Sequence, residues 1–157
     1  MAGPRRLGVY VNLHAFDNIY CSYRRWKSER PGEKRLLQFR IEVKVILESH
    51  TNNPEQRLPS YDCILEFSKL LDRVWRDKII VSLDDPELPI FKAMDAKGLI
   101  NLSLLPDTGA EFFSFEMFNW FKIWLTNSGL INHVDVRAVE VIEHYGVNIV
   151  SASLYSE

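Results

Sequence analysis

The stretch LLQFRIEVKVIL at residues 36–47 decides the fold of this chain. Apolar side chains occupy every second position from Leu37 to Val45, and charged residues stand between the last of them. Because successive side chains of a strand point to opposite faces of a sheet, this alternation predicts a long strand with one buried face. The same alternation in HVDVRAVEVIE at 133–143 predicts a second strand of this kind.

Two shorter strands are predicted at the ends of the chain, GVYVNL at 8–13 and VNIVSASLY at 147–155. A turn at Tyr145–Gly146 joins the last strand to the one before it as a hairpin. The first strand is expected to pair with 36–47. A polar, proline-bearing loop at 51–59 closes that unit.

Two helices are predicted between these strands. Ser60 stands at an N-cap position, and apolar residues at helical spacing predict a helix from about Tyr61 to Arg76. The second helix, EFFSFEMFNWFKIWL at 111–125, ends at the C-terminal signal 127–129. It has too little polar surface for a helix with one wet side, so we expect a sheet on one side and another subunit on the other.

The region between the helices has no regular pattern. Two prolines interrupt SLDDPELPIF at 82–91, and GLINLSLLP at 98–106 predicts a brief strand or an extended segment. The predicted order is strand, strand, helix, extended segment, helix, strand, strand. This is an α+β arrangement, ββααββ, and residues 1–157 are expected to form a single domain.

The composition is that of an ordinary soluble domain, with 157 residues, 46% hydrophobic, 25% charged and a net charge of −2. A net charge near zero argues against a nucleic-acid binder, since such affinity rests on neutralising many phosphates. The two cysteines make no disulfide framework, and no leader or long apolar run stands out. We expect a cytoplasmic protein with no membrane partner.

One segment departs from this balance. RRWKSERPGEKR at 24–35 has six basic and two acidic residues, a net charge of +4. It is suited to contact with a phosphate or a nucleic acid. The plainer interpretation is a solvated loop whose charges oppose aggregation.

Several short strings resemble one known family. RDKIIVSLDDPEL at 76–88 can be laid on a family loop with Asp77 at its Asp position, and 114–116 falls where the family has Pro-Thr-x-Glu. The run at 139–143 resembles a closing Val-x-Val-x-Glu, with Tyr155 near a terminal Tyr. The family is that of 6-pyruvoyl-tetrahydropterin synthase and 6-carboxytetrahydropterin synthase. The resemblance implies the tunnelling fold, an antiparallel sheet with two helices packed on one face that oligomerises into a barrel.

The resemblance also implies substrate-binding residues. Glu143 matches the Glu that grips the amino-pyrimidine edge of a pterin, and a carboxylate can accept two parallel hydrogen bonds from an N–H pair. The alternative is that Glu143 is only a polar residue at a strand end. Glu116 and Arg35 are the other two predicted substrate-binding residues.

The zinc site of the family is expected to be lost. Family members hold zinc with three histidines, but Arg35 and Leu37 stand at the paired positions. Arginine has no available lone pair at neutral pH and leucine has no donor atom. His14 lies near the position of the first ligand, and one imidazole cannot hold the ion. We therefore predict no metal and no cofactor.

The predicted catalytic residues are Lys78, Asp77, His14 and Cys21. Lys78 stands at the family's His position beside Asp77, and Cys21 lies on the connection that bears the family's Cys. A lysine has an ordinary pKa of about 10.4, so Lys78 acts as a base or forms a Schiff base only if burial lowers that value. The chemistry this implies is metal-independent, of the lyase, aldol or cyclisation type.

Two functions follow from the resemblance. The first is an enzyme that binds a pterin-like or other cyclic amide-type molecule at a subunit interface of a homo-oligomer, a trimer or hexamer. The second is a non-catalytic binding or scaffold subunit that kept the oligomer and lost the zinc site. A phosphate or nucleic-acid contact through 24–35 is a third, weaker interpretation.

Overall fold

The computed structural model describes residues 9–15, 19–49, 60–146 and 148–155. Within these ranges the strands form one sheet, with β1 Val9–Ala15, β2 Tyr20–Tyr23, β3 Leu37–Ser49, β4 Lys78–Ser82, β5 Leu102–Leu105, β6 Val134–Tyr145 and β7 Asn148–Tyr155. The helices are α1 Ser60–Val74, α2 Leu88–Ala96, α3 Ala110–Asn127 and a short 3₁₀ helix, η1, at Pro31–Lys34. No described helix is both long enough and apolar enough to span a membrane.

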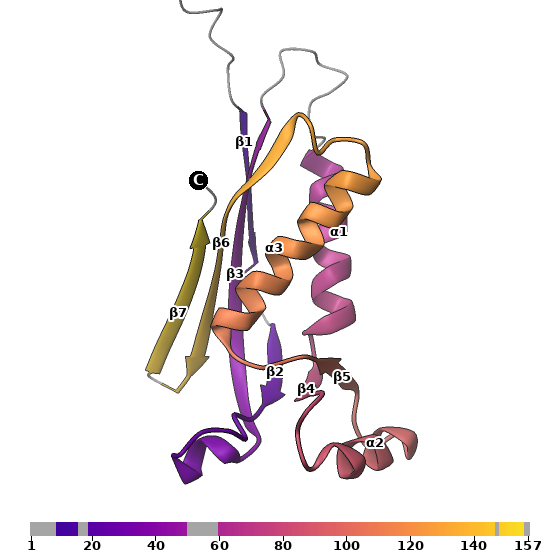
Figure 1. The fold of residues 1–157 in the computed structure, drawn as a ribbon, viewed down its shortest axis with the longest axis vertical. Coiled ribbons are helices and arrows are strands. Elements are labelled where there is room, and N and C mark those ends of the chain that lie inside the picture. The colour runs from indigo at the N-terminus through magenta and orange to yellow at the C-terminus, as the bar shows by residue number, and fades with distance from the viewer. Residues whose placement is uncertain (1–8, 16–18, 50–59, 147, 156–157) are drawn as a thin grey trace, which may run out of the picture.

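The sheet is built around the long antiparallel pair of β3 and β6 (Figure 1). Its strands lie in the order β5-β4-β2-β3-β6-β7, and β1 also pairs with β3. β1 and β2 contact successive stretches of the same edge of β3. β4 runs parallel to β2 and β5, whereas the other neighbours are antiparallel. The predicted α+β class and the strand pattern at 36–47 are confirmed.

One face of the sheet forms the core. The alternation of β3 buries Phe39, Ile41, Val43, Val45 and Leu47. The buried residues of β6 are Val134, Val136, Val139, Val141 and Glu143. The row on β6 therefore ends in a carboxylate, two residues before the end of the strand. That end of β6 lies at the lower end of the sheet in Figure 1.

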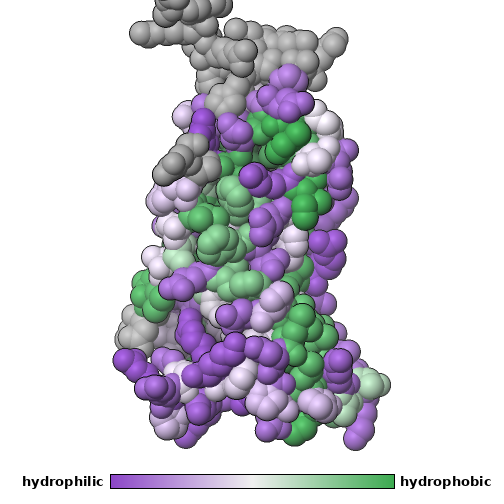
Figure 2. All heavy atoms as spheres, viewed as in Figure 1, coloured by the Kyte–Doolittle hydropathy of each residue, from purple (hydrophilic) through white to green (hydrophobic). Residues whose placement is uncertain are grey.

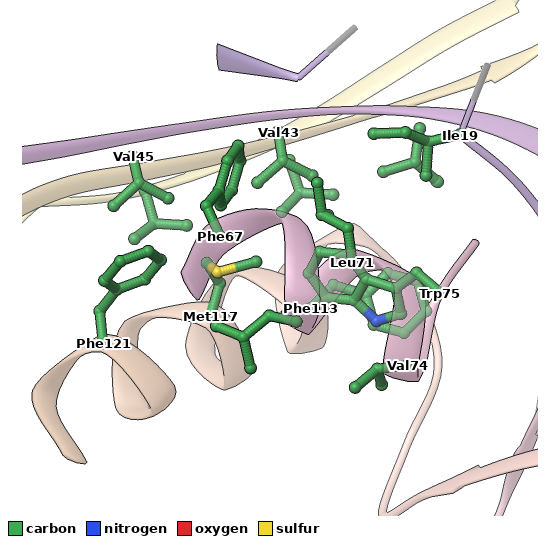
Figure 3. Close-up of a cluster of buried hydrophobic side chains, with 14 of the residues drawn as sticks. Ile19, Val43, Val45, Phe67, Leu71, Val74, Trp75, Phe113, Met117 and Phe121 are labelled. Carbon is green, nitrogen blue, oxygen red and sulfur yellow. The ribbon is translucent and has the colours of Figure 1, made fainter. Parts of the chain in front are cut away.

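The helices α1 and α3 cover this buried face (Figure 1, Figure 3). The rings of Trp75 and Phe113 lie 5.4 Å apart, and those of Phe67 and Phe121 lie 6.1 Å apart. The aromatic helix predicted at 111–125 is thus core on one side. On its other side Phe115 and Ile123 are 55% and 57% exposed, and their cover by another subunit stays a prediction.

The structure contains elements that the sequence pattern did not predict. Helix α2 begins in the stretch assigned as irregular because Pro89 lies in its first turn, where a missing N–H costs no hydrogen bond. β2 is only four residues long, too short for a periodic signal. The predicted loop at 51–59 lies outside the described residues.

Candidate functional site

Two consecutive arginines follow β2, and each pairs with a carboxylate far away in the sequence. Arg24 donates from Nε to Oδ2 of Asp85 at 2.8 Å and from Nη2 to Oδ1. Arg25 donates from Nη2 to both oxygens of Glu143, at 3.1 and 2.9 Å. The basic segment is therefore joined to the turn after β4 and to the end of β6.

The pair of Arg24 and Asp85 anchors the segment. Asp85 is buried and also accepts a hydrogen bond from the backbone N–H of Glu87. Burial would raise the pKa of Asp85, but the hydrogen bonds and charge of Arg24 hold it below its ordinary value. Arg24 also donates to the backbone oxygen of Lys34, so one side chain fixes three stretches of chain.

The pair of Arg25 and Glu143 is asymmetric. The Glu143 side chain is 2% exposed, whereas that of Arg25 is 35% exposed. Burial alone would lower the pKa of Arg25, but the charge and hydrogen bonds of Glu143 raise it above its ordinary value. The carboxylate is therefore almost fully buried, whereas about a third of the arginine side chain is exposed.

Neighbouring backbone shapes the space that Arg25 occupies. A Cβ added at Gly109 would lie 3.4 Å from Nη2 of Arg25, and Gly109 has a φ of +116°, which favours glycine. The backbone N–H of Arg25 donates to the oxygen of Glu33 at 2.9 Å. Thr108 donates from its hydroxyl to the oxygen of Arg24. The start of α3 and the basic segment thus enclose the guanidinium together.

A cavity of about 410 Å³, here called the Glu143 pocket, opens beside this pair. It lies at the lower end of the molecule, where hydrophilic side chains gather over the segment between β2 and β3 (Figure 2). Its lining is Arg25, Arg30, Gly32, Glu33, Arg35, Leu37, Phe39, Glu143, Tyr145 and Val150. The rings of Phe39 and Tyr145 lie 5.7 Å apart. The pocket combines an apolar, aromatic wall with charged groups.

The structure brings two of the three predicted substrate-binding residues into this pocket, Glu143 and Arg35. Glu116 does not line it. That residue is half-buried on α3, and burial raises its pKa. The predicted roles of all three residues stay predictions.

Three of the four predicted catalytic residues, Cys21, Asp77 and Lys78, lie outside the lining of the pocket. Cys21 and Lys78 are register partners of β2 and β4, and Asp77 donates its backbone N–H to Tyr20. Burial, and then the charge of Glu143, raises the pKa of the Cys21 thiol far above its ordinary value, so little reactive thiolate forms. His14 pairs with Lys44 on another stretch of β3, and its side chain lies outside the described residues. The side chains of Cys21, Asp77 and Lys78 therefore do not converge on the pocket.

The main site residue that sequence reasoning missed is Arg25. Its only signal was membership of the +4 segment at 24–35, because a pairing across 118 positions leaves no local pattern. Tyr23 was also missed. It is fully buried and stacks on Phe39 at 4.2 Å, and burial followed by the charge of Glu143 raises its pKa well above the ordinary value.

The residues at the predicted zinc positions do not fit the ion. Arg35 and Leu37 both line the Glu143 pocket, and neither side chain can donate a lone pair to zinc. Among the residues that the structure describes, no three His, Cys, Asp or Glu side chains form a group that could hold a metal ion. Loss of a zinc site stays a prediction.

Known proteins resemble this chain in structure. No family model and no curated protein matches its sequence. The crystal structure of an uncharacterized protein from Wolinella succinogenes matches with a TM-score of 0.74 and 17% identity, over 96% of this chain and 99% of that one. The 6-pyruvoyl tetrahydropterin synthase of Plasmodium falciparum matches with a TM-score of 0.59 and 10% identity, over 95% and 99%. This chain therefore has the tunnelling fold of 6-pyruvoyl-tetrahydropterin synthase.

Proposed function

We propose that this protein binds a small ring-shaped molecule in the Glu143 pocket. The observation that supports the proposal is the make-up of this cavity, which joins an apolar wall to a charged floor. Its volume of about 410 Å³ lies within the range of small-molecule sites, which are mostly apolar with a few placed polar groups. A bicyclic aromatic molecule matches that size.

The wall of the pocket suits a flat ring. Leu37, Phe39, Tyr145 and Val150 supply its apolar surface. Aromatic side chains favour stacked or edge-to-face contact with other rings. The ring of the ligand would lie against Phe39 and Tyr145 while its polar group reaches the floor.

A second copy of the chain would complete the pocket in this proposal. Tyr145 and Val150 line the cavity but are 46% and 54% exposed, and they belong to the hairpin of β6 and β7 at one edge of the sheet. An open edge strand is a template for pairing with another chain. Pairing along β7 would cover these two residues and place the site at a subunit interface.

Ligand binding is better supported than a catalytic role of the residues predicted to be catalytic. Lys78 and Asp77 do not line the pocket, and Cys21 is buried with a raised thiol pKa. The enzyme hypothesis needs Lys78 within reach of the bound molecule. We therefore favour a ligand-binding protein with the tunnelling fold over a lyase.

The test is ligand binding to a variant with a filled pocket. Gly32 lines the cavity, and a Cβ there meets nothing within 4 Å, so Gly32→Phe should fill the pocket without strain. Lys34→Phe, in the same short helix but outside the lining, is the matched control. The probes are pterin, guanine, 2-naphthoate and 2-naphthamide. Isothermal titration calorimetry measures the affinity of each protein for each probe.

We expect at least one probe to bind the unmodified protein and Lys34→Phe equally, with at least tenfold weaker binding to Gly32→Phe. Absence of binding by every probe would contradict the proposal. So would binding that Gly32→Phe leaves unchanged.

A further inference from the structure

We infer that the Glu143 pocket takes an organic anion, whose carboxylate or phosphate is held by the guanidinium of Arg25, and that Glu143 is the positioning residue that fixes Arg25. This inference rests on the proposed function and names the ligand class of the same site. It differs from the expectation that Glu143 itself accepts the N–H pair of a ligand.

A ligand in the pocket can reach the side chain of Arg25 more easily than that of Glu143. Both oxygens of Glu143 already accept hydrogen bonds from Nη2 of Arg25, and the carboxylate is 2% exposed against 35% for the arginine. A carboxylate has about four acceptor sites, but this one is almost fully buried, so a ligand N–H pair that binds both oxygens would take the place of Arg25. That exchange would leave a half-buried guanidinium without its partner, which is costly.

Arg25 has N–H donors that its pairing with Glu143 does not use. The side-chain hydrogen bonds it makes to described residues all leave from Nη2. A guanidinium has five N–H donors in a planar fork that matches the oxygens of carboxylates and phosphates. Arg25 lines the cavity, so the remaining donors are available to an anion there.

The guanidinium of Arg25 is held in place by its neighbours. Both oxygens of Glu143 accept hydrogen bonds from Nη2, and a Cβ added at Gly109 would lie 3.4 Å from Nη2 and 3.6 Å from Nε. A side chain at position 109 would therefore come into van der Waals contact with this group. A fixed donor loses little conformational entropy on binding, which favours affinity.

The charged residues that line the pocket have a net positive charge, like Arg25 itself. Arg30 and Arg35 share the pocket with Arg25, against the carboxylates of Glu33 and Glu143. Glu33 accepts a hydrogen bond from Ser28 and lies 3.9 Å from Arg30. Within the described part of the chain no carboxylate forms an ion pair with Arg35. The accessible charge of the pocket is therefore positive, which attracts anions.

Probes that share one ring and differ only in the polar group test this inference. We suggest 2-naphthoate and 2-naphthyl phosphate as the anions, 2-naphthamide as the neutral N–H donor and 2-naphthamidine as the cationic one. Titration of the full chain, followed by calorimetry and by amide chemical shifts, gives each affinity. We expect one or both anions to bind at least tenfold more tightly than the amide and the amidine.

Two variants show which residue is responsible for the preference for an anion. Arg25→Gln should weaken binding of the anion at least tenfold and leave the amide unchanged, whereas Glu143→Gln should keep the preference for the anion because Arg25 retains its charge. If Arg25→Gln does not fold, the double variant Arg25→Met with Glu143→Met replaces the pair with apolar groups of similar length, and the same loss is expected.

The outcomes separate the inference from the proposed function. Tighter binding of the amide or the amidine, lost in Glu143→Gln, would show that Glu143 reads the ligand directly. The inference would then fail and the proposed pocket would stand. Absence of binding by all four probes would overturn the inference, and it would overturn the proposed function as well if pterin and guanine also failed to bind. Equal binding of anion and amide, unchanged in Arg25→Gln, would overturn the inference alone.

Discussion

At the scale of single residues, the arrangement of charges follows from the cost of burying a carboxylate. Asp85 and Glu143 are almost fully buried, and an unpaired charge in such a place is strongly unfavourable. Each is matched by one of two adjacent arginines, Arg24 and Arg25. These two arginines of the basic segment are thus held in specific pairs, whereas its other four basic residues are exposed to solvent. The segment contributes three guanidinium groups to the pocket, and that of Arg25 is the one paired with a buried carboxylate.

The sequence could predict part of this site. Glu143 and Arg35 were both predicted to bind a ligand, on their resemblance to family positions, and the structure places them in one pocket. Arg25 could not be predicted, because its partner lies 118 residues away and no local periodicity marks such a contact. Lys78 and Asp77 were chosen by alignment to a short string, which carries no information on where the side chains point.

The half-buried Glu116 provides a test of pH dependence. Burial raises its pKa, so the folded protein binds this proton more tightly than the unfolded chain does. Stability therefore falls as the pH rises through the raised pKa, and the ionised side chain is destabilising at pH 7. Glu116→Gln should melt at a higher temperature than the unmodified protein at pH 7. The difference should shrink as the pH falls below about 4.

The control for Glu116→Gln is Glu29→Gln at an exposed position. Thermal melting followed by circular dichroism over a pH range from about 3 to about 8, on both sides of the ordinary pKa of a glutamate, provides the measurement. A melting temperature that drops at pH 7 in Glu116→Gln would mean that the carboxylate has a stabilising partner. That result would favour its predicted role in the site.

At the scale of elements, the long periodic segments were predicted, whereas β2, β4 and α2 were not. β3, β6 and α3 each span twelve or more residues, so their hydrophobic patterns repeat several times. β2 has four residues, and its place between β3 and β4 is set by partners on both sides. The two prolines at 86 and 89 suggested an irregular stretch, but tertiary structure can use a proline to begin a helix.

The start of α3 connects element geometry to the site, and Gly109→Ala tests that connection. The φ of +116° and ψ of 160° at Gly109 belong to a region that only glycine adopts readily, so a side chain there should cost about 1–3 kcal/mol of stability. The added Cβ would also come into van der Waals contact with Nη2 of Arg25, so relief of the backbone strain would shift that guanidinium. We expect a lower urea midpoint together with weaker binding of 2-naphthoate.

Gly32→Ala is the matched control for stability, since a Cβ at that position meets nothing within 4 Å and its φ is not positive. Its urea midpoint should stay the same or rise slightly. If Gly109→Ala were as stable as Gly32→Ala, the backbone at the start of α3 would not have the conformation described above.

At the scale of the whole molecule, exposed apolar groups lie along the edge that β7 forms. Ile149 is 63% exposed on this strand, and Val150 beside it is 54% exposed. Ile149→Lys should lower the native mass of the protein, because a lysine on an edge strand opposes strand pairing. Ile90→Lys is the matched control, as Ile90 is 56% exposed on α2.

Light scattering after size exclusion measures both variants. We expect an oligomer for the unmodified protein and for Ile90→Lys, and smaller species for Ile149→Lys. A monomeric unmodified protein would contradict the proposed interface. Ligand binding to the Glu143 pocket of the monomer could still be measured.

The most direct test of the central claim is a crystal structure of the protein with 2-naphthoate. The account predicts the naphthalene ring against Phe39 and Tyr145, with a carboxylate oxygen about 2.7–3.2 Å from a nitrogen of Arg25. The pair of Arg25 and Glu143 should remain intact. A ligand outside the pocket, or one bound with Arg25 displaced from Glu143, would contradict it.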